Sequence, residues 1–162
     1  VANIDNFRTF KIKGLPQFIE LARSLHNFKF TIVGLSKKMI LEIEKPKNIT
    51  LIGKVNSNKL VELYSENFFY YQGSIIEGLP NVLCEAMLCE CVPIGNNVFG
   101  ISDVIGNTGI IFNGFDELYK VKKFLKSKIV LTGKKARERI KINYPLSKRV
   151  DKFKSLFDDA KV

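Results

Sequence analysis

The sequence has few of the residues that anchor a protein at a membrane interface or cross-link small secreted domains. Among 162 residues there are no tryptophans, one histidine and three cysteines. No stretch is apolar for long enough to span a bilayer, and no signal peptide heads the chain. These absences argue against a membrane-spanning chain and lead us to expect a cytoplasmic protein.

The three cysteines, Cys84, Cys89 and Cys91, are odd in number and clustered. Their spacing fits no zinc pattern, so we expect buried, reduced thiols rather than a metal site or a disulfide. The single histidine, His26, lies at the end of a predicted helix. We interpret it as structural or solvated rather than as a general base.

Positive charge is concentrated towards the end of the chain. The net charge is +10, and residues 120–154 hold fourteen Lys and Arg against two acids. We favour solvated helix faces as the explanation, with peripheral contact to anionic membrane lipids as the alternative. Nucleic acid is a weaker partner because the basic run lacks interleaved stacking aromatics, and we expect no nucleic-acid binding.

The length suits one α/β core but not two. Apolar periodicity alternates between strand and helix, which predicts an α/β fold with a parallel sheet and helices on both faces. The expected strands are 1–4, 28–33, 49–52, 68–71, 92–94 and 109–112. The expected helices are 15–25, 37–44, 57–66, 80–90, 115–127, 132–142 and 147–160. Residues 96–109 are the most loop-like segment.

Chemically useful residues follow several of these strands. Ligands of a parallel sheet bind outside the carboxyl ends of the strands. The candidates at those ends are Lys13, Gly34, Val55, residues 74–77 and residues 96–103. The strand pattern therefore predicts that these segments meet at one edge of the sheet.

The most informative segment is 74–87, where Glu77 and Glu85 flank the start of a predicted helix. Gly78 allows close backbone approach, and Pro80 suits the first helical position. The start of a helix offers unpaired N–H groups and a positive dipole end, and carboxylates beside it can hold a polyhydroxylated ligand. The alternative is that Glu77 caps the helix and Glu85 is an exposed charge.

The string Ser-x-x-Glu-Gly-Leu-Pro-Asn-Val-Leu-x-Glu-Ala-Met resembles the signature of the retaining GT-B glycosyltransferases of family four, or glycosyl transferases group 1. Other segments resemble that family in the same order, from about residue 1 to residue 114. They are Lys13-Gly14-Leu15, residues 30–34, residues 48–55, residues 91–94 and residues 99–105. The resemblance implies one Rossmann-like half of a GT-B fold. Residues 1–162 would be the C-terminal donor-binding domain of a larger enzyme, with the N-terminal acceptor domain elsewhere.

The resemblance also implies roles for individual residues. Glu77 would lie at the transferred sugar, Lys13 would neutralise the departing diphosphate, and Glu85 would accept hydrogen bonds from the ribose hydroxyls. The other implied donor-binding residues are Gly34, Lys54, Val55, Ser74, Gly78, Leu79, Pro80, Asn81, Val82, Gly100 and Arg8.

Three positions depart from the family pattern. Ala2-Asn3 stands where a Gly-Arg pair is usual, and Arg8 or Lys11 is our candidate for the missing charge. Glu90 replaces a usual glycine after the signature helix, and Asp103 replaces a glutamate.

The implied reaction is transfer of a hexose, with retention, from a nucleotide-diphosphate sugar to a polysaccharide or glycolipid acceptor. The resemblance implies that no cofactor or metal is needed, and the chain has no Asp-x-Asp motif. We expect residues 1–162 alone to be inactive. Two alternatives stay open: another GT-B enzyme, such as a glycogen synthase-like protein or an epimerase, and a non-catalytic nucleotide-binding or interaction domain.

Overall fold

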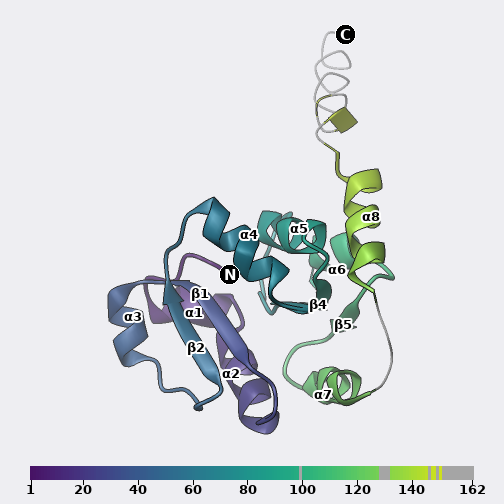
Figure 1. Cartoon of the computed structure of the whole chain (residues 1–162). Coiled ribbons are helices and arrows are strands. Elements are labelled where there is room, and N and C mark those ends of the chain that lie inside the picture. Colours follow the sequence, from purple (N-terminus) through teal and green to yellow (C-terminus); the bar gives the residue numbers. More distant parts are fainter. Residues whose placement is uncertain (99, 128–131, 146, 149, 151–162) are drawn as a thin grey trace, which may run out of the picture.

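Strands and helices alternate along the chain (Figure 1). The computed structural model describes residues 1–98, 100–127, 132–145, 147, 148 and 150. The strands are β1 (Phe30–Leu35), β2 (Ile49–Gly53), β3 (Phe69–Gln72), β4 (Val92–Asn96) and β5 (Ile110–Phe112). The helices are α1 (Phe7–Ile12), α2 (Leu15–Ser24), α3 (Lys37–Glu42), α4 (Ser57–Ser65), α5 (Asn81–Leu88), α6 (Ile101–Ile105), α7 (Leu118–Lys126) and α8 (Gly133–Asn143).

All strand pairs are parallel and form two sheets, β1–β2 and β3–β4–β5. Successive residues of a strand point to opposite faces of the sheet, so each strand can pack on both sides. In β3, Phe69 and Tyr71 pack against the core cluster that includes α2 and α7, whereas Tyr70 belongs to the cluster of α5, α6 and α8. The expected α/β fold with helices on both faces is therefore confirmed.

Residues 1–4 were expected to form a strand, and this expectation is wrong. Only Ile4 forms a bridge, with Leu35, and it is parallel. The backbone N–H of Ala2 donates to Val33 at 3.1 Å, and that of Ile4 donates to Gly34 at 3.0 Å. This segment follows only the carboxyl end of β1. Among the described residues no strand pairing joins β1 to β3, so the strands form two sheets rather than the one that was expected.

Two short helices were not expected from the sequence. Helix α1 has six residues, and the side chain of its N-cap, Asn6, accepts from the N–H of Thr9 at 2.9 Å. Helix α6 has five residues and lies inside the segment expected to be a loop. Helices this short carry too little apolar periodicity to be recognised. The expected helix over 147–160 lies almost wholly outside the described residues.

The remaining expected elements are present within a few residues of their predicted bounds. Among the described residues, no helix combines the length and the apolar character needed to cross a bilayer.

The end of α5 explains why a glycine suits position 90. Glu90 is the one described non-glycine residue with positive φ, at 66°. The N–H of Cys91 donates to Ala86 and that of Glu90 donates to Met87, the hydrogen-bond pattern of a Schellman motif. A side chain in this left-handed conformation costs about 1–2 kcal/mol, which glycine avoids. Glu90 is exposed at this end of α5.

We predict that Glu90→Gly stabilises the fold by about 1 kcal/mol, because the backbone strain is relieved. Glu90→Ala is the matched control, since both variants lose the ion pair with Arg137 at 3.6 Å but only glycine relieves the strain. The measurement is chemical denaturation of both variants. Equal stability of the glycine and alanine variants would contradict the prediction.

Candidate functional site

Two glycines bring three loops together at the carboxyl edge of the strands. Gly14 has φ 69°, and a Cβ there would collide with the carbonyl of Gly73, directly after β3. Gly100 has φ 83°, and a Cβ there would collide with the carbonyl of Gly78. An L side chain fits at neither position, so these close contacts require glycine. The loop after β3 is thus held between the start of α2 and the start of α6.

The central contact of the site is an ion pair between Lys13 and Glu77. The Nζ atom of Lys13 lies 2.7 Å from Oε2 of Glu77, and the two side chains are 28% and 18% exposed. The N–H of Ile75 donates to the carbonyl of Ile12 at 2.9 Å, which fixes the loop beside α1. An ion pair with this little exposure is screened less by salt than a surface pair. Lys13 and Glu77 therefore lie together at the edge where they were predicted to meet.

A series of hydrogen bonds between buried side chains holds Glu77 in place. Tyr70 and Gln72 lie on the same face of β3, and the Tyr70 hydroxyl donates to Gln72 Oε1 at 2.9 Å. The Nε2 group of Gln72 donates to Ser74 Oγ at 2.9 Å and to Glu77 Oε2 at 3.3 Å. Burial raises the pKa of Tyr70 well above its ordinary value, so its hydroxyl stays protonated and can donate.

Gln72 was missed by the sequence analysis. It is 5% exposed and ends a strand whose other residues are aromatic. A polar residue closing a buried strand is a signal that could have identified it, because buried polar groups need hydrogen-bond partners.

The start of α5 lies open beside this ion pair. Pro80 is the N-cap, one position before the first helical residue where we expected it, and no side chain caps the helix. The N–H groups of Asn81 and Val82 consequently have no partner among the described residues. A Cβ at Gly78 would have nothing within 4 Å. The hypothesis that Glu77 merely caps the helix is wrong, since its carboxylate pairs with Lys13.

Glu85 lies on α5, one residue beyond Cys84, and is exposed. Its carboxylate lies near Tyr64 of α4, whose pKa is raised first by burial and second by the charge of Glu85. The same carboxylate is one cause of the raised pKa of Tyr70, after burial and Tyr64. Glu77 and Glu85 therefore both influence Tyr70, although no contact joins the two glutamates.

Four predicted residues lie apart from the ion pair. Gly34 lies against the backbone of Ala2. Lys54 is exposed and 3.6 Å from the carboxylate of Asp5, and Val55 is half-buried. Arg8 is exposed on α1 and makes no ion pair with another described residue. Their proposed contacts with a nucleotide stay predictions.

The cysteines are free thiols, as expected. Cys91 is buried, whereas Cys84 and Cys89 are only half-buried. Burial, followed by the charge of Glu85, raises the pKa of Cys84 to about 11, and burial raises that of Cys91 to about 12. Within the described ranges, no group of three or more His, Cys, Asp or Glu could hold a metal ion.

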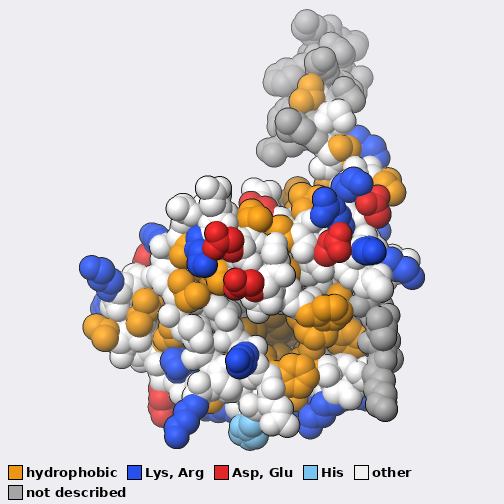
Figure 2. Space-filling model, in the orientation of Figure 1, with side chains coloured by type: hydrophobic (Ala, Val, Ile, Leu, Met, Phe, Trp, Pro, Cys, Tyr) orange, Lys and Arg blue, Asp and Glu red, His pale blue; other side chains and the backbone are white. Residues whose placement is uncertain are grey.

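Many charges of the basic run have local partners. Arg137 pairs with Glu90, Lys141 with Glu138, and Lys120 with Glu117. On the face seen in Figure 2, Lys and Arg around α8 are interspersed with acidic side chains. Contact of this segment with anionic lipids stays a prediction, and residues 128–131 and 151–154 lie outside the described part of the chain.

Comparison with known proteins gives a family match over most of the chain. The profile of glycosyl transferases group 1 matches residues 7–144. No curated protein matches the sequence.

Solved structures share the fold at low sequence identity. Sucrose-phosphate synthase from Thermosynechococcus elongatus has TM-score 0.76 and 18% identity, covering 93% of this chain and 43% of that one. The C-terminal domain of a glycosyl transferase group 1 family protein from Francisella tularensis has TM-score 0.66 and 18% identity, covering 84% and 82%. The pneumococcal O-GlcNAc transferase, solved with UDP and GlcNAc, has TM-score 0.67 and 17% identity, covering 92% and 33%. The chain thus spans less than half the length of the first and third of these proteins, and has the fold of a Rossmann-like half of the GT-B architecture.

A double-mutant cycle with Lys13→Met and Glu77→Gln tests whether the site is held by its ion pair. We predict a coupling free energy of about 1–2 kcal/mol in chemical denaturation, because the pair is largely shielded from solvent. The control is the cycle Lys59→Met with Glu62→Gln, a pair with the same 2.7 Å separation but about half exposed. We expect a much smaller coupling there. Equal couplings in the two cycles would show that Lys13 and Glu77 behave as an ordinary surface pair.

Proposed function

Because this chain belongs to the family of glycosyl transferases group 1, we propose that it is the donor-binding half of a GT-B enzyme. The enzyme would bind a nucleotide-diphosphate sugar and transfer its hexose, with retention, to a polysaccharide or glycolipid acceptor. Free cysteine thiols are consistent with a reducing cytoplasmic setting.

The observation that carries the proposal is the Lys13–Glu77 pair beside the open start of α5. A departing diphosphate needs positive charge and hydrogen-bond donors on its oxygens. Lys13 supplies the charge, and the N–H groups of Asn81 and Val82 supply donors at the positive end of a helix dipole. Groups fixed in place before reaction stabilise developing charge without reorganisation cost.

Glu77 is the catalytic carboxylate in this proposal. Its position is held by Lys13 and by Gln72, so the carboxylate can face the sugar while the ammonium faces the phosphate. During transfer, the bond between the anomeric carbon and the diphosphate oxygen breaks. The acceptor oxygen then bonds to the anomeric carbon on the same face of the sugar, and its hydroxyl proton passes to the departing diphosphate oxygen. We propose that Lys13 and the N–H groups at the start of α5 stabilise the departing diphosphate without a bound metal.

The nucleoside would lie along the same edge of the sheet. Glu85 would accept hydrogen bonds from the ribose hydroxyls, and its exposed carboxylate is accessible for this. The base would lie against the loops that contain Gly34 and Val55, which follow β1 and β2. The parallel pairing of β1 and β2 directs both loops to the same edge of their sheet.

The acceptor site would belong to a second domain facing this edge. Three large apolar side chains are exposed in the loop that carries Glu77: Ile75 at 47%, Ile76 at 70% and Leu79 at 51%. A group of exposed apolar residues marks a surface that another body covers. The partial coverage of sucrose-phosphate synthase agrees with this arrangement.

We predict that residues 1–162 bind a nucleoside diphosphate in a one-to-one complex but transfer no sugar by themselves. The test is calorimetry with UDP, GDP and ADP, followed by a transfer assay with the domain alone and with the full-length enzyme. Sugar transfer by the isolated domain would contradict the two-domain arrangement. Binding without transfer by the full-length enzyme would favour a non-catalytic nucleotide-binding protein.

We predict that Glu85→Gln lowers nucleoside diphosphate affinity by about 1.5–3 kcal/mol, roughly ten- to 150-fold, the range for hydrogen bonds to a charged group. Glu138→Gln on α8 is the control. It should leave nucleoside diphosphate affinity unchanged, because it removes a glutamate charge far along the chain from the site. Glu77→Gln should mainly lower turnover of the full-length enzyme. Unchanged affinity in a folded Glu85→Gln domain would mean that Glu85 is only an exposed helical charge.

A further inference from the structure

Two buried polar residues end neighbouring strands next to the Lys13–Glu77 pair. Gln72 is the last residue of β3 and Asn96 is the last residue of β4, and their exposed fractions are 5% and 6%. The side chain of Gln72 donates to the carboxylate of Glu77. The side chain of Asn96 hydrogen-bonds to backbone groups of two loops instead. The site therefore borders on a second buried amide, whose role depends on what those loops carry.

The side chain of Asn96 joins the loops that follow β3 and β5. Its Nδ2 group donates to the carbonyl of Ser74 at 3.2 Å, and its Oδ1 atom accepts from the N–H of Gly114 at 2.9 Å. A backbone carbonyl only accepts and a backbone N–H only donates, so the two partners fix the orientation of the amide. Neither an aspartate carboxylate nor a leucine of similar shape could make both hydrogen bonds.

The carbonyl of Ser74 and the N–H of Ile75 belong to one peptide group, and this group is held from both sides. Asn96 donates to the carbonyl from β4, and the N–H donates to the carbonyl of Ile12 at 2.9 Å. Because the peptide group is planar, its two polar groups point in opposite directions, towards β4 and towards the end of α1. Ile12 directly precedes Lys13, so these hydrogen bonds lead from β4 to the ion pair.

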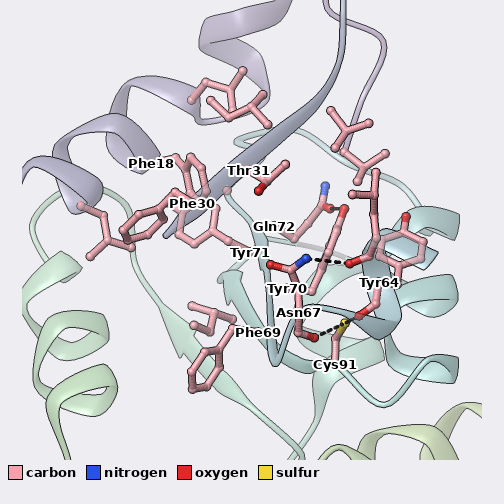
Figure 3. A pocket seen from close by; sticks show the side chains of 18 of the residues that line it. Phe18, Phe30, Thr31, Tyr64, Asn67, Phe69, Tyr70, Tyr71, Gln72 and Cys91 are labelled. Carbon is pink, nitrogen blue, oxygen red and sulfur yellow. Dashed lines mark hydrogen bonds between the residues drawn. The ribbon is translucent and has the colours of Figure 1, made fainter. Parts of the chain in front are cut away.

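The side chain of Ser74 is held as well. Gln72 donates to Ser74 Oγ at 2.9 Å, and Figure 3 shows Gln72 among the residues that line a cavity next to β3. Apolar packing contributes little to the loop that follows, since Ile75 and Ile76 are both exposed. Hydrogen bonds at Ser74 therefore determine the direction in which the chain leaves β3 towards Glu77.

We propose that Asn96 is a positioning residue of the site, which holds the loop after β3 so that Glu77 reaches Lys13. It acts through the peptide group between residues 74 and 75, and its hydrogen bond with Gly114 ties the same loop to the end of β5. The effect on the ion pair is independent of the proposed function, whereas the effect on turnover rests on it.

The alternative is that Asn96 only satisfies buried backbone groups and so stabilises the fold. Asn48 provides the comparison, because its Nδ2 group donates to the carbonyls of Ala22, Leu25 and Phe28 at 2.9 Å, 3.1 Å and 3.1 Å. Asn48 directly precedes β2 and lies at the amino end of that strand, away from the carboxyl edge. It is therefore a matched control for a lost amide donor.

The test repeats the cycle of Lys13→Met and Glu77→Gln on residues 1–162 that carry Asn96→Leu or Asn48→Leu. Leucine resembles asparagine in shape but neither donates nor accepts a hydrogen bond. With Asn96→Leu, we expect the coupling free energy of the ion pair to fall to about half of its wild-type value or less. With Asn48→Leu it should stay unchanged, although both variants lower the overall stability. Unchanged coupling with Asn96→Leu, or an equal loss with both variants, would overturn the proposal.

A second measurement keeps Asn96 intact, so it does not depend on whether the leucine variant folds. Coupling between two sites is reciprocal, and breaking the ion pair with Lys13→Met should therefore change the surroundings of Asn96. We expect the nuclear magnetic resonance signals of the Asn96 side-chain amide and of the Gly114 N–H to shift. The side-chain amide signals of Asn48 should stay in place. Unshifted signals of Asn96 and Gly114 would contradict the proposal.

Turnover of the full-length enzyme separates this proposal from the proposed function. Asn96→Leu should lower kcat by about ten- to a hundredfold with little change in KM for the donor, because Glu77 is displaced while Glu85 keeps its place. Asn48→Leu should leave kcat unchanged. Full turnover by a variant that has lost the Lys13–Glu77 coupling would overturn the proposed role of Glu77 and leave the positioning of the pair in place. Reduced turnover with retained coupling would overturn the positioning role alone.

Discussion

The parallel pairing of the strands within each sheet is the constraint on which this structure depends. Parallel pairing sends the carboxyl ends of the strands of a sheet to one edge, where loops from distant parts of the sequence can meet. Lys13 and Glu77 are 64 positions apart, yet their side chains touch at that edge. The glycines at 14 and 100 then let the loops approach more closely than side chains would permit. The chemistry of the site follows from this topology, because each strand contributes a loop and no strand contributes the whole site.

The edge also explains which parts of the site could be predicted. The Lys13–Glu77 contact was accessible from the sequence, because both residues lie at the edge where strand ends were expected. Gln72 was not, because its role depends on which face of β3 it occupies and on the hydroxyl of Tyr70 two positions earlier. Pro80 was placed one position too far into the helix, since cap geometry depends on backbone angles that composition does not fix.

Prediction of the fold succeeded for the strands and failed for the shortest helices. Strands β1 to β5 were all anticipated, since each contains several apolar residues within a short segment. Helices α1 and α6 were missed, because six and five residues span less than two turns. The division into two sheets was not predicted. Residues 1–4 have the composition of a strand, but of these only Ile4 forms a bridge, with Leu35.

We infer that the carboxyl edge of this domain binds a nucleoside diphosphate. The most direct measurement is a nuclear magnetic resonance titration of isotope-labelled residues 1–162 with UDP, GDP or ADP. We predict that the amide chemical shifts change first at Lys13, Gly14 and residues 77–82, with smaller changes near Glu85. Shift changes confined to the basic helices α7 and α8, or no shift change with any of the three nucleotides, would contradict it.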